Sequence, residues 1–204
     1  MSISTWVLLP VKPFNLSKSR LKPILSPNER RRLAQQLLHQ TLALLTTIPL
    51  IDQILLITRD PQALQLAQQY PIITYKEPAT AGLNQALTLG QHHAHRAGAA
   101  AILVLPLDLP FATPTDITTI LTPPPHPAPY ITICPDQQFQ GTNALLLHPS
   151  LPFNFHYGLN SYQAHQQEAQ KHAYHINTVT LPNLQFDLDT PSHWQQYQHK
   201  AIKL

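Results

Sequence analysis

The stretch "AAILVLPLDLP", residues 100–110, contains the most apolar run in the chain and ends in an acidic turn. A short, continuous apolar run of this kind indicates a strand buried on both faces, as in a parallel sheet covered by helices. Proline cannot donate to a strand ladder, so the strand has to end before Pro110. The stretch therefore predicts a central strand over 100–106, with Asp108 placed where the chain leaves the sheet.

Apolar runs and helical patterns alternate on both sides of this strand. We expect further strands over 5–11, 53–58, 72–76, 130–135, 142–149 and 176–182. Helices are expected over 26–45, 60–69, 80–98 (after its glycine), 113–121, 161–173 and 190–198. This alternation predicts a single α/β domain over residues 1–204, with a mostly parallel sheet and helices on both faces.

Composition narrows the class of protein. The only cysteine, Cys134, excludes an internal disulfide and a cysteine-based metal site, and it favours a reducing, cytoplasmic location. No apolar segment approaches membrane length, so no membrane partner is expected. The formal net charge is +3, and the N-terminal third is basic, which indicates an anionic partner. Aromatic residues are not interleaved with these bases, so a single-stranded nucleic acid is poorly supported.

Three cations lie in the loop that follows the first strand. The segment "PVKPFNLSKSRL", residues 10–21, contains Lys12, Lys18 and Arg20. In open parallel sheets the ligand lies beyond the carboxyl ends of the strands, and phosphate oxygens need fixed cationic donors. The loop contains neither a P-loop nor a dinucleotide-binding glycine pattern. On spacing alone, a phosphate site and a solvated basic loop remain equally open.

Two aspartates stand one residue apart in "FDLDTP", residues 186–191, although only 10 of the 204 residues are acidic. If Asp187 and Asp189 are extended, their side chains point to the same side, about 6.6 Å apart. Such a pair can flank magnesium, which binds few protein carboxylates together with phosphate oxygens. The alternative is that Asp189 or Thr190 caps the following helix, which leaves Asp187 unexplained. Asp108 is either a metal ligand or an ordinary turn residue.

Small residues mark further candidate positions. Thr142 begins a strand beside a glycine, and Gly158 and Ser161 stand at the start of an expected helix. The first N–H groups of a helix form a ready anion site, and Ser161 is also expected to be the N-cap of this helix. Glu77 or Asn84, before another helix, could read a purine edge.

Histidines are numerous, but their spacing gives no metal-binding motif. His92, His93 and His95 lack the i, i+4 pair of the zinc-protease pattern and are expected to form a polar helix face. His165 lies near the expected anion site. It is either a packed side chain or a residue that orients a substrate.

Six segments, taken in order, give the sequence a family resemblance. They are "LPVKPFNLSKSRL", "GLNQAL", "LPLDLP", "GTNALLL", "YGLNSYQAH" and "FDLDTP". Together they resemble the guanylyltransferases of deazaflavin (coenzyme F-420) biosynthesis, which join GMP from GTP to 2-phospho-L-lactate or phosphoenolpyruvate. The resemblance implies a Rossmann-like nucleotidyltransferase fold similar to type-A glycosyltransferases. One departure is Tyr157, where the family often has phenylalanine.

The resemblance also implies roles for individual residues. The acidic positions that hold Mg²⁺ match Asp108, Asp187 and Asp189. Acceptor-binding positions match Thr142, Gly158 and Ser161. The catalytic basic loop near the triphosphate matches Lys12, Lys18 and Arg20, and the nucleoside is expected near Leu9, Pro10, Lys12 and Asn84.

The resemblance implies GTP and a small phosphorylated acid as substrates, and a downstream transferase that takes up the product. Which phosphorylated acid is the acceptor stays open among phosphoenolpyruvate, 2-phospho-L-lactate and 3-phosphoglycerate. Two alternatives also stay open. One is another nucleotidyltransferase of the same fold, acting on molybdopterin or a sugar phosphate. The other is a non-catalytic nucleotide- or RNA-binding module.

Overall fold

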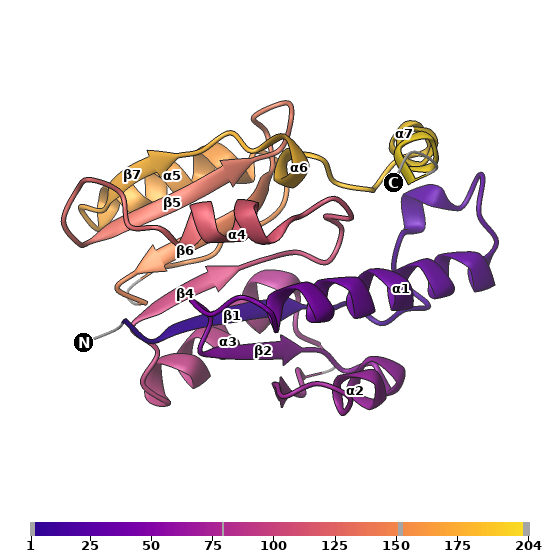
Figure 1. Ribbon diagram of the computed structural model, residues 1–204, viewed down its shortest axis with the longest axis horizontal. Helices are drawn as coiled ribbons and strands as arrows, with labels where there is room; N and C mark the ends of the chain where they lie inside the picture. The colour runs from indigo at the N-terminus through magenta and orange to yellow at the C-terminus, as the bar shows by residue number, and fades with distance from the viewer. Residues whose placement is uncertain (1–2, 79, 151–152, 202–204) are drawn as a thin grey trace.

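A seven-stranded sheet organises the computed structural model, which describes residues 3–78, 80–150 and 153–201. The strand order is β3-β2-β1-β4-β6-β5-β7, and the neighbouring pairs are parallel except the two that β6 makes. The predicted α/β fold with a mostly parallel sheet is therefore confirmed (Figure 1). The strands are β1 (Thr5–Pro10), β2 (Gln53–Ile57), β3 (Ile73–Tyr75), β4 (Ala101–Val104), β5 (Tyr130–Pro135), β6 (Thr142–His148) and β7 (His175–Thr178).

Helices cover both faces of this sheet, with α1 and α4 on one side and α3 and α5 on the other (Figure 1). Several begin as the sequence predicts. Ser26 caps α1 in a capping box with Glu29, and Asp60 caps α2. The helices are α1 (Pro27–Leu45), α2 (Pro61–Ala67), α3 (Leu83–Arg96), α4 (Pro114–Leu121), α5 (Ser161–Lys171), α6 (Pro182–Gln185) and α7 (Pro191–Ala201), with a 3-10 turn η1 (Ser19–Leu21).

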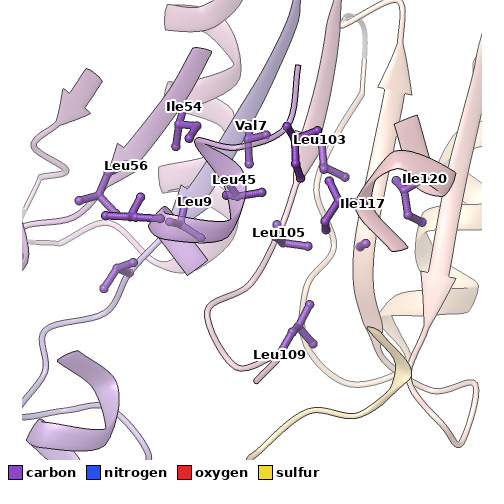
Figure 2. Close-up of a cluster of buried hydrophobic side chains, with 14 of the residues drawn as sticks. Val7, Leu9, Leu45, Ile54, Leu56, Leu103, Leu105, Leu109, Ile117 and Ile120 are labelled. Atoms are coloured by element: carbon purple, nitrogen blue, oxygen red, sulfur yellow. The ribbon is translucent and has the colours of Figure 1, made fainter. Parts of the chain in front are cut away.

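The core has two layers because side chains alternate along each strand. Val7 and Leu9 of β1 face the layer beneath α1 and α4, whereas Trp6 and Leu8 face the layer beneath α3 and α5. Figure 2 shows the first layer, where residues of β1, β2 and β4 meet Leu45 of α1 and residues of α4. Strands buried on both sides explain why the sequence shows continuous apolar runs.

The reversed strand β6 has a direct consequence for the site. It pairs antiparallel with both β4 and β5, so its first residue, Thr142, lies at the edge where β4 and β5 end. The residues that follow the parallel strands therefore meet the beginning of β6 at one edge of the sheet.

A third apolar cluster anchors the chain after α6 at this edge. Phe186 and Leu188 are buried against leucines of η1 and α1, with Trp194 and Tyr197 of α7 packed against them. The backbone N–H of Leu188 also donates to the carbonyl of Asp108 at 2.8 Å. The segment 186–189 is thus held beside the turn that follows β4.

Two sequence predictions need correction, and one short element was not predicted. The strand expected over 176–182 ends at Thr178, and a short helix, α6, begins at Pro182, because proline suits the first helical position but not a ladder. Ser161 is the first residue of α5 rather than its cap, which is Asn160 in the left-handed region (φ 55°). The loop after β1 contains the turn η1, which the sequence analysis did not predict.

A separate finding concerns membranes. In the described ranges, no helix combines the length and the apolar character that are needed to cross a bilayer.

Candidate active site

A cavity of about 610 Å³ opens at the carboxyl edge of the sheet. Its lining comes from the segments after β1, β2, β3 and β4, from the beginning of β6 and from the start of α5. Parallel strands deliver their following loops to the same edge, as the sequence analysis expected. The cavity brings together most of the predicted site residues, namely Pro10, Lys12, Lys18, Asp108, Thr142, Gly158, Ser161, Asp187 and Asp189.

The other predicted residues lie around this cavity. Leu9 is fully buried in the core, and Asn84 is not part of the lining. Arg20 lines a neighbouring cavity of about 670 Å³, which shares Gly158, Asp187 and Asp189 with the first. The basic loop therefore borders both cavities rather than one.

Lys18 connects the two acidic segments. Its ammonium group lies 3.2 Å from an Asp108 carboxylate oxygen and donates to the Leu188 carbonyl at 2.8 Å. Only 6% of the Lys18 side chain is exposed, so this charge depends on those oxygens for solvation. The residue stands in the left-handed region (φ 53°). Lys18 thus holds the loop after β1, the turn after β4 and the segment 186–189 together.

Asp189 forms an ion pair with Arg20, whose Nη1 lies 2.7 Å from the carboxylate. The Arg20 side chain is 73% exposed, so water screens this pair and it contributes little to stability. Thr190 caps α7, because its hydroxyl accepts a hydrogen bond from the N–H of His193 at 3.3 Å. Asp187 and Asp189 therefore need another explanation than capping.

Asp187 is the least compensated of the three aspartates. In the part of the chain that the structure describes, its carboxylate has neither an ion-pair partner nor a side-chain hydrogen bond. Burial raises the pKa of Asp187, and the nearby charges of Asp108 and Asp189 raise it further, against lowering effects of His193 and of its own backbone N–H. A half-buried carboxylate in this environment would be stabilised by an added cation.

The chemistry of these oxygens suits magnesium, but they do not form a finished cage. Over residues 3–78, 80–150 and 153–201, no group of three His, Cys, Asp or Glu side chains is close enough to hold a metal ion. Magnesium is usually bound through one or two carboxylates plus substrate phosphates and waters. The uncompensated Asp187 fits a site of this kind, which a bound phosphate would complete.

Hydroxyl groups line the cavity at the beginning of β6 and the start of α5, and a buried histidine packs behind them. Thr142 and Ser161 lie 3.4 Å apart through their side-chain oxygens, and Gly158 adopts φ +139°. His165, one helical turn after Ser161, is fully buried and lies 3.0 Å from the Thr142 oxygen. The structure thus brings the three predicted acceptor residues together and shows that His165 is packed behind them.

The side-chain amide of Asn84 binds the backbone of Tyr157, which the sequence did not predict. Its amide nitrogen donates to the carbonyl of Tyr157 at 3.0 Å, and its amide oxygen accepts from the Tyr157 N–H at 2.7 Å. This pair of bonds ties the beginning of α3 to the segment before Gly158. The nucleotide-binding role expected for Asn84 stays a prediction.

Glu77 and Arg59 lie at the other end of the cavity, after β3 and β2. Their charges are 3.4 Å apart, and only 9% of the Glu77 side chain is exposed. Burial raises the pKa of Glu77, whereas Arg59 lowers it. Arg59 was not among the predicted site residues. It follows the strand expected over 53–58 directly, so its position after a buried strand, like that of Asp108, could have indicated it.

Comparison with known proteins assigns the chain to a family. Residues 5–196 match the family model described as "Guanylyl transferase CofC like". A phosphoenolpyruvate guanylyltransferase from Conexibacter woesei is 35% identical over 189 residues, covering 93% of this chain and 85% of the relative. A 3-phospho-D-glycerate guanylyltransferase from Colwellia psychrerythraea is 30% identical over 187 residues, covering 92% and 88%.

Solved structures agree at the level of the fold. A nucleotidyl transferase from Methanothermobacter superposes with a TM-score of 0.70, covering 100% of this chain and 99% of its own. Sequence identity to it is only 12%, so this likeness concerns architecture alone.

Proposed function

The chain belongs to the CofC-like guanylyl transferase family, and we propose that it transfers GMP from GTP to a small phosphorylated acid with release of pyrophosphate. The names of the relatives favour phosphoenolpyruvate as the acceptor, with 3-phosphoglycerate and 2-phospho-L-lactate as competing choices. The family resemblance implies that the product passes to a downstream transferase of coenzyme F-420 biosynthesis.

One observation carries this proposal. A single cavity has two walls that can each bind an anion, one from the loop after β1 and one from the beginning of β6. Asp108 follows β4, which lies between these two strands in the sheet. On one side, the loop after β1 provides Lys12, whereas Lys18 in the same loop is held by Asp108 and Leu188. On the other, Thr142 and the N-terminal end of α5 provide hydroxyl and N–H donors. Two anionic substrates can meet in such a cavity, whereas a site for one nucleotide needs only the first wall.

The proposed reaction is an in-line displacement. A phosphate oxygen of the acceptor attacks the α-phosphorus of GTP and forms a new P–O bond. The bond from the α-phosphorus to the oxygen that bridges it to the β-phosphorus breaks, and pyrophosphate leaves with the electron pair. A phosphate monoester has a second pKa of about 6, so the nucleophile is largely ionised at neutral pH and needs no general base. The protein has to position the two substrates and neutralise their charge.

Charge neutralisation divides between the basic loop and the acidic residues. Lys12 and the 73% exposed Arg20 are the candidates to stabilise the departing pyrophosphate, since the buried Lys18 is held by Asp108 and Leu188. Asp187 would hold Mg²⁺, with Asp108 or Asp189 as a second carboxylate. When bound, this cation supplies positive charge to the phosphate oxygens of both substrates.

The base of the nucleotide belongs, in this proposal, at the end of the cavity that contains Glu77. Guanine presents an N1–H and an amino group side by side, and a carboxylate can accept from both. Adenine presents an acceptor at N1, which a carboxylate repels. Asn84 is less suited to this task because both ends of its amide already bind the backbone of Tyr157.

An assay of all substrate pairs tests the proposal. The purified protein is given Mg²⁺, either GTP or ATP, and one of the three phosphorylated acids, and pyrophosphate release and product mass are measured. Because the expected product is short-lived, a downstream transferase and its deazaflavin acceptor are included. We expect release with GTP and one preferred acid. Absence of release with every pair would contradict the proposal.

A further inference from the structure

His165 lies directly behind the acceptor wall of the cavity. It stands four residues after Ser161 on α5, so both side chains lie on one face of the helix, toward the beginning of β6. Its side chain is 0% exposed and cannot touch a ligand itself. Its hydrogen bond toward the cavity joins Nδ1 to the hydroxyl of Thr142 at 3.0 Å.

The backbone determines which ring nitrogen of His165 carries the proton. The N–H of His156 donates to Nε2 of His165 at 2.9 Å. A backbone amide only donates, so Nε2 has to be unprotonated. A neutral imidazole with a bare Nε2 carries its proton on Nδ1. The doubly protonated ring would set two N–H groups against each other, and burial together with His156 lowers the pKa of His165 to about 3.

This tautomer fixes the direction of the next hydrogen bond. Nδ1–H donates to Oγ1 of Thr142, and the hydroxyl of Ser161 donates to the same oxygen at 3.4 Å. Both lone pairs of the Thr142 oxygen then face donors of the protein. In the described ranges no acceptor receives the Thr142 proton, which is free to point into the cavity.

We propose that His165 is a positioning residue that fixes the Thr142 hydroxyl as a hydrogen-bond donor toward the anionic acceptor. With the other tautomer, Thr142 would donate to His165 and would turn its lone pairs toward the anion. Whether Thr142 donates a hydrogen bond to the anion or repels it thus depends on the position of one proton on His165, which does not contact the ligand. The identity of the anion rests on the proposed function, whereas the tautomer does not.

Neighbouring contacts hold this arrangement in place. Asn84 fixes both backbone groups of Tyr157, next to the N–H of His156 that selects the tautomer. The ring of Tyr157 packs edge-on against His165, with centroids 4.8 Å apart. The other titratable groups that face His165 are His156 and Glu168, whose side chains lie 3.3 Å apart. This series of hydrogen bonds therefore connects Asn84 of α3, the segment before α5, and Thr142 of β6.

A spectroscopic measurement on the unaltered protein tests the tautomer. Long-range ¹H–¹⁵N correlations of histidine-labelled protein distinguish a protonated from a bare ring nitrogen. We expect Nδ1 of His165 to be protonated and Nε2 to be bare across the neutral pH range. A proton on Nε2, or on both nitrogens, would overturn the inference.

Two matched substitutions test the consequence for the acceptor. The amide of His165→Asn can replace Nδ1–H as a donor to Thr142, whereas that of His165→Gln reaches the place of Nε2 and leaves Thr142 without its donor. We expect His165→Gln to raise KM for the acceptor about 10-fold or more with little change in KM for GTP, and His165→Asn to recover most of this loss.

Repeating the His165→Gln substitution in a Thr142→Val protein distinguishes a positioning role of His165 from a general loss of structure. In Thr142→Val the hydroxyl is absent, so adding His165→Gln should cost little more, because both changes remove the same contact. Equal losses in the two His165 variants, losses in both KM values, or fully additive effects would overturn the proposal. Unaltered protein that turns over no phosphorylated acid would contradict the proposed function instead, and the spectroscopic result would still decide the tautomer.

Discussion

Glu168 on α5 is a buried carboxylate and Asp187 at the cavity is a half-buried one, but their surroundings are opposite. Hydrogen-bond donors surround Glu168, whereas two other carboxylates lie near Asp187. On α5, Glu168 is 2% exposed and receives hydrogen bonds from Asn154, His156, Lys171 and His172. Burial alone would raise the pKa of Glu168, but these bonds outweigh it and lower the pKa to about 2. At the cavity, Asp187 has two like charges nearby and a raised pKa.

The difference shows which acid is structural. A carboxylate that its own chain satisfies contributes to folding, because each donor would otherwise lack a partner. A carboxylate left uncompensated beside others costs stability and persists where a ligand supplies the missing charge. Glu168 therefore stabilises the fold, whereas the raised pKa and missing partner of Asp187 support its proposed role as a cation ligand.

Asp187→Asn should give the largest effect. Removing this charge takes away a ligand of the proposed cation, so we expect kcat/KM for GMP transfer to fall about 10³-fold. The unfolding free energy should stay unchanged or rise, since repulsion from Asp108 and Asp189 is relieved. Asp52→Asn is the matched control, because Asp52 bonds the N–H of Thr5 at the start of β1. Near-normal turnover in Asp187→Asn would remove the metal role.

Glu168→Gln should show the reverse pattern. The amide keeps one acceptor oxygen but sets an NH₂ group against donors, so we expect a loss of about 2–3 kcal/mol in unfolding free energy. Activity at a temperature where the variant is folded should change much less than in Asp187→Asn. Urea denaturation measures the first quantity and pyrophosphate release the second. A variant as stable as the original protein would show that the network is not structural.

Low pH should abolish the contribution of Glu168 to the free energy of unfolding. Its folded pKa of about 2 lies below the ordinary 4.5, so its contribution is present above 4.5 and is lost as pH falls toward 2. His165, lowered from 6.5 to about 3, adds a loss that begins at higher pH, since only the unfolded chain takes up its proton there. In urea denaturation at a series of pH values, the gap between the original protein and Glu168→Gln should close below pH 4.5. A constant gap would contradict this account.

Glu77 is intermediate between the two regions, with one cationic partner and a pKa that burial raises. If it reads guanine, Glu77→Gln should lower the preference for GTP over ATP about 10-fold, as expected for losing one bidentate contact. Steady-state kinetics with both nucleotides measure this ratio. Glu29→Gln, on the exposed start of α1, is the control and should leave the ratio unchanged. An unaltered ratio in Glu77→Gln would assign base recognition elsewhere.

Much of this arrangement could be predicted from local sequence. The run 100–106 indicated a buried strand because covered parallel strands are apolar throughout, and β4 (Ala101–Val104) lies within it. Asp108, Thr142 and Asp187 were singled out by position alone, and they line one cavity. Each of these predictions depended on neighbouring residues and on the rule that strand ends carry the chemistry.

What could not be predicted depends on contacts between distant segments. The reversal of β6 follows from its pairing with β4 and β5, which no local pattern encodes. Lys18 looked free to bind phosphate, but the Leu188 carbonyl that it binds lies 170 residues away. No local pattern marks Glu168 as the centre of a network, because three of its four side-chain partners, Asn154, His156 and His172, are neutral or titratable groups.

The most direct test compares three proteins in one assay. Mg²⁺-dependent pyrophosphate release from GTP and phosphoenolpyruvate, or the preferred acid, is measured for the unaltered chain, Asp187→Asn and Glu168→Gln under conditions where all three are folded. The account predicts release by the unaltered chain and by Glu168→Gln, and almost none by Asp187→Asn. Release by Asp187→Asn at the rate of the unaltered chain, or none by the unaltered chain with any acid, would contradict it.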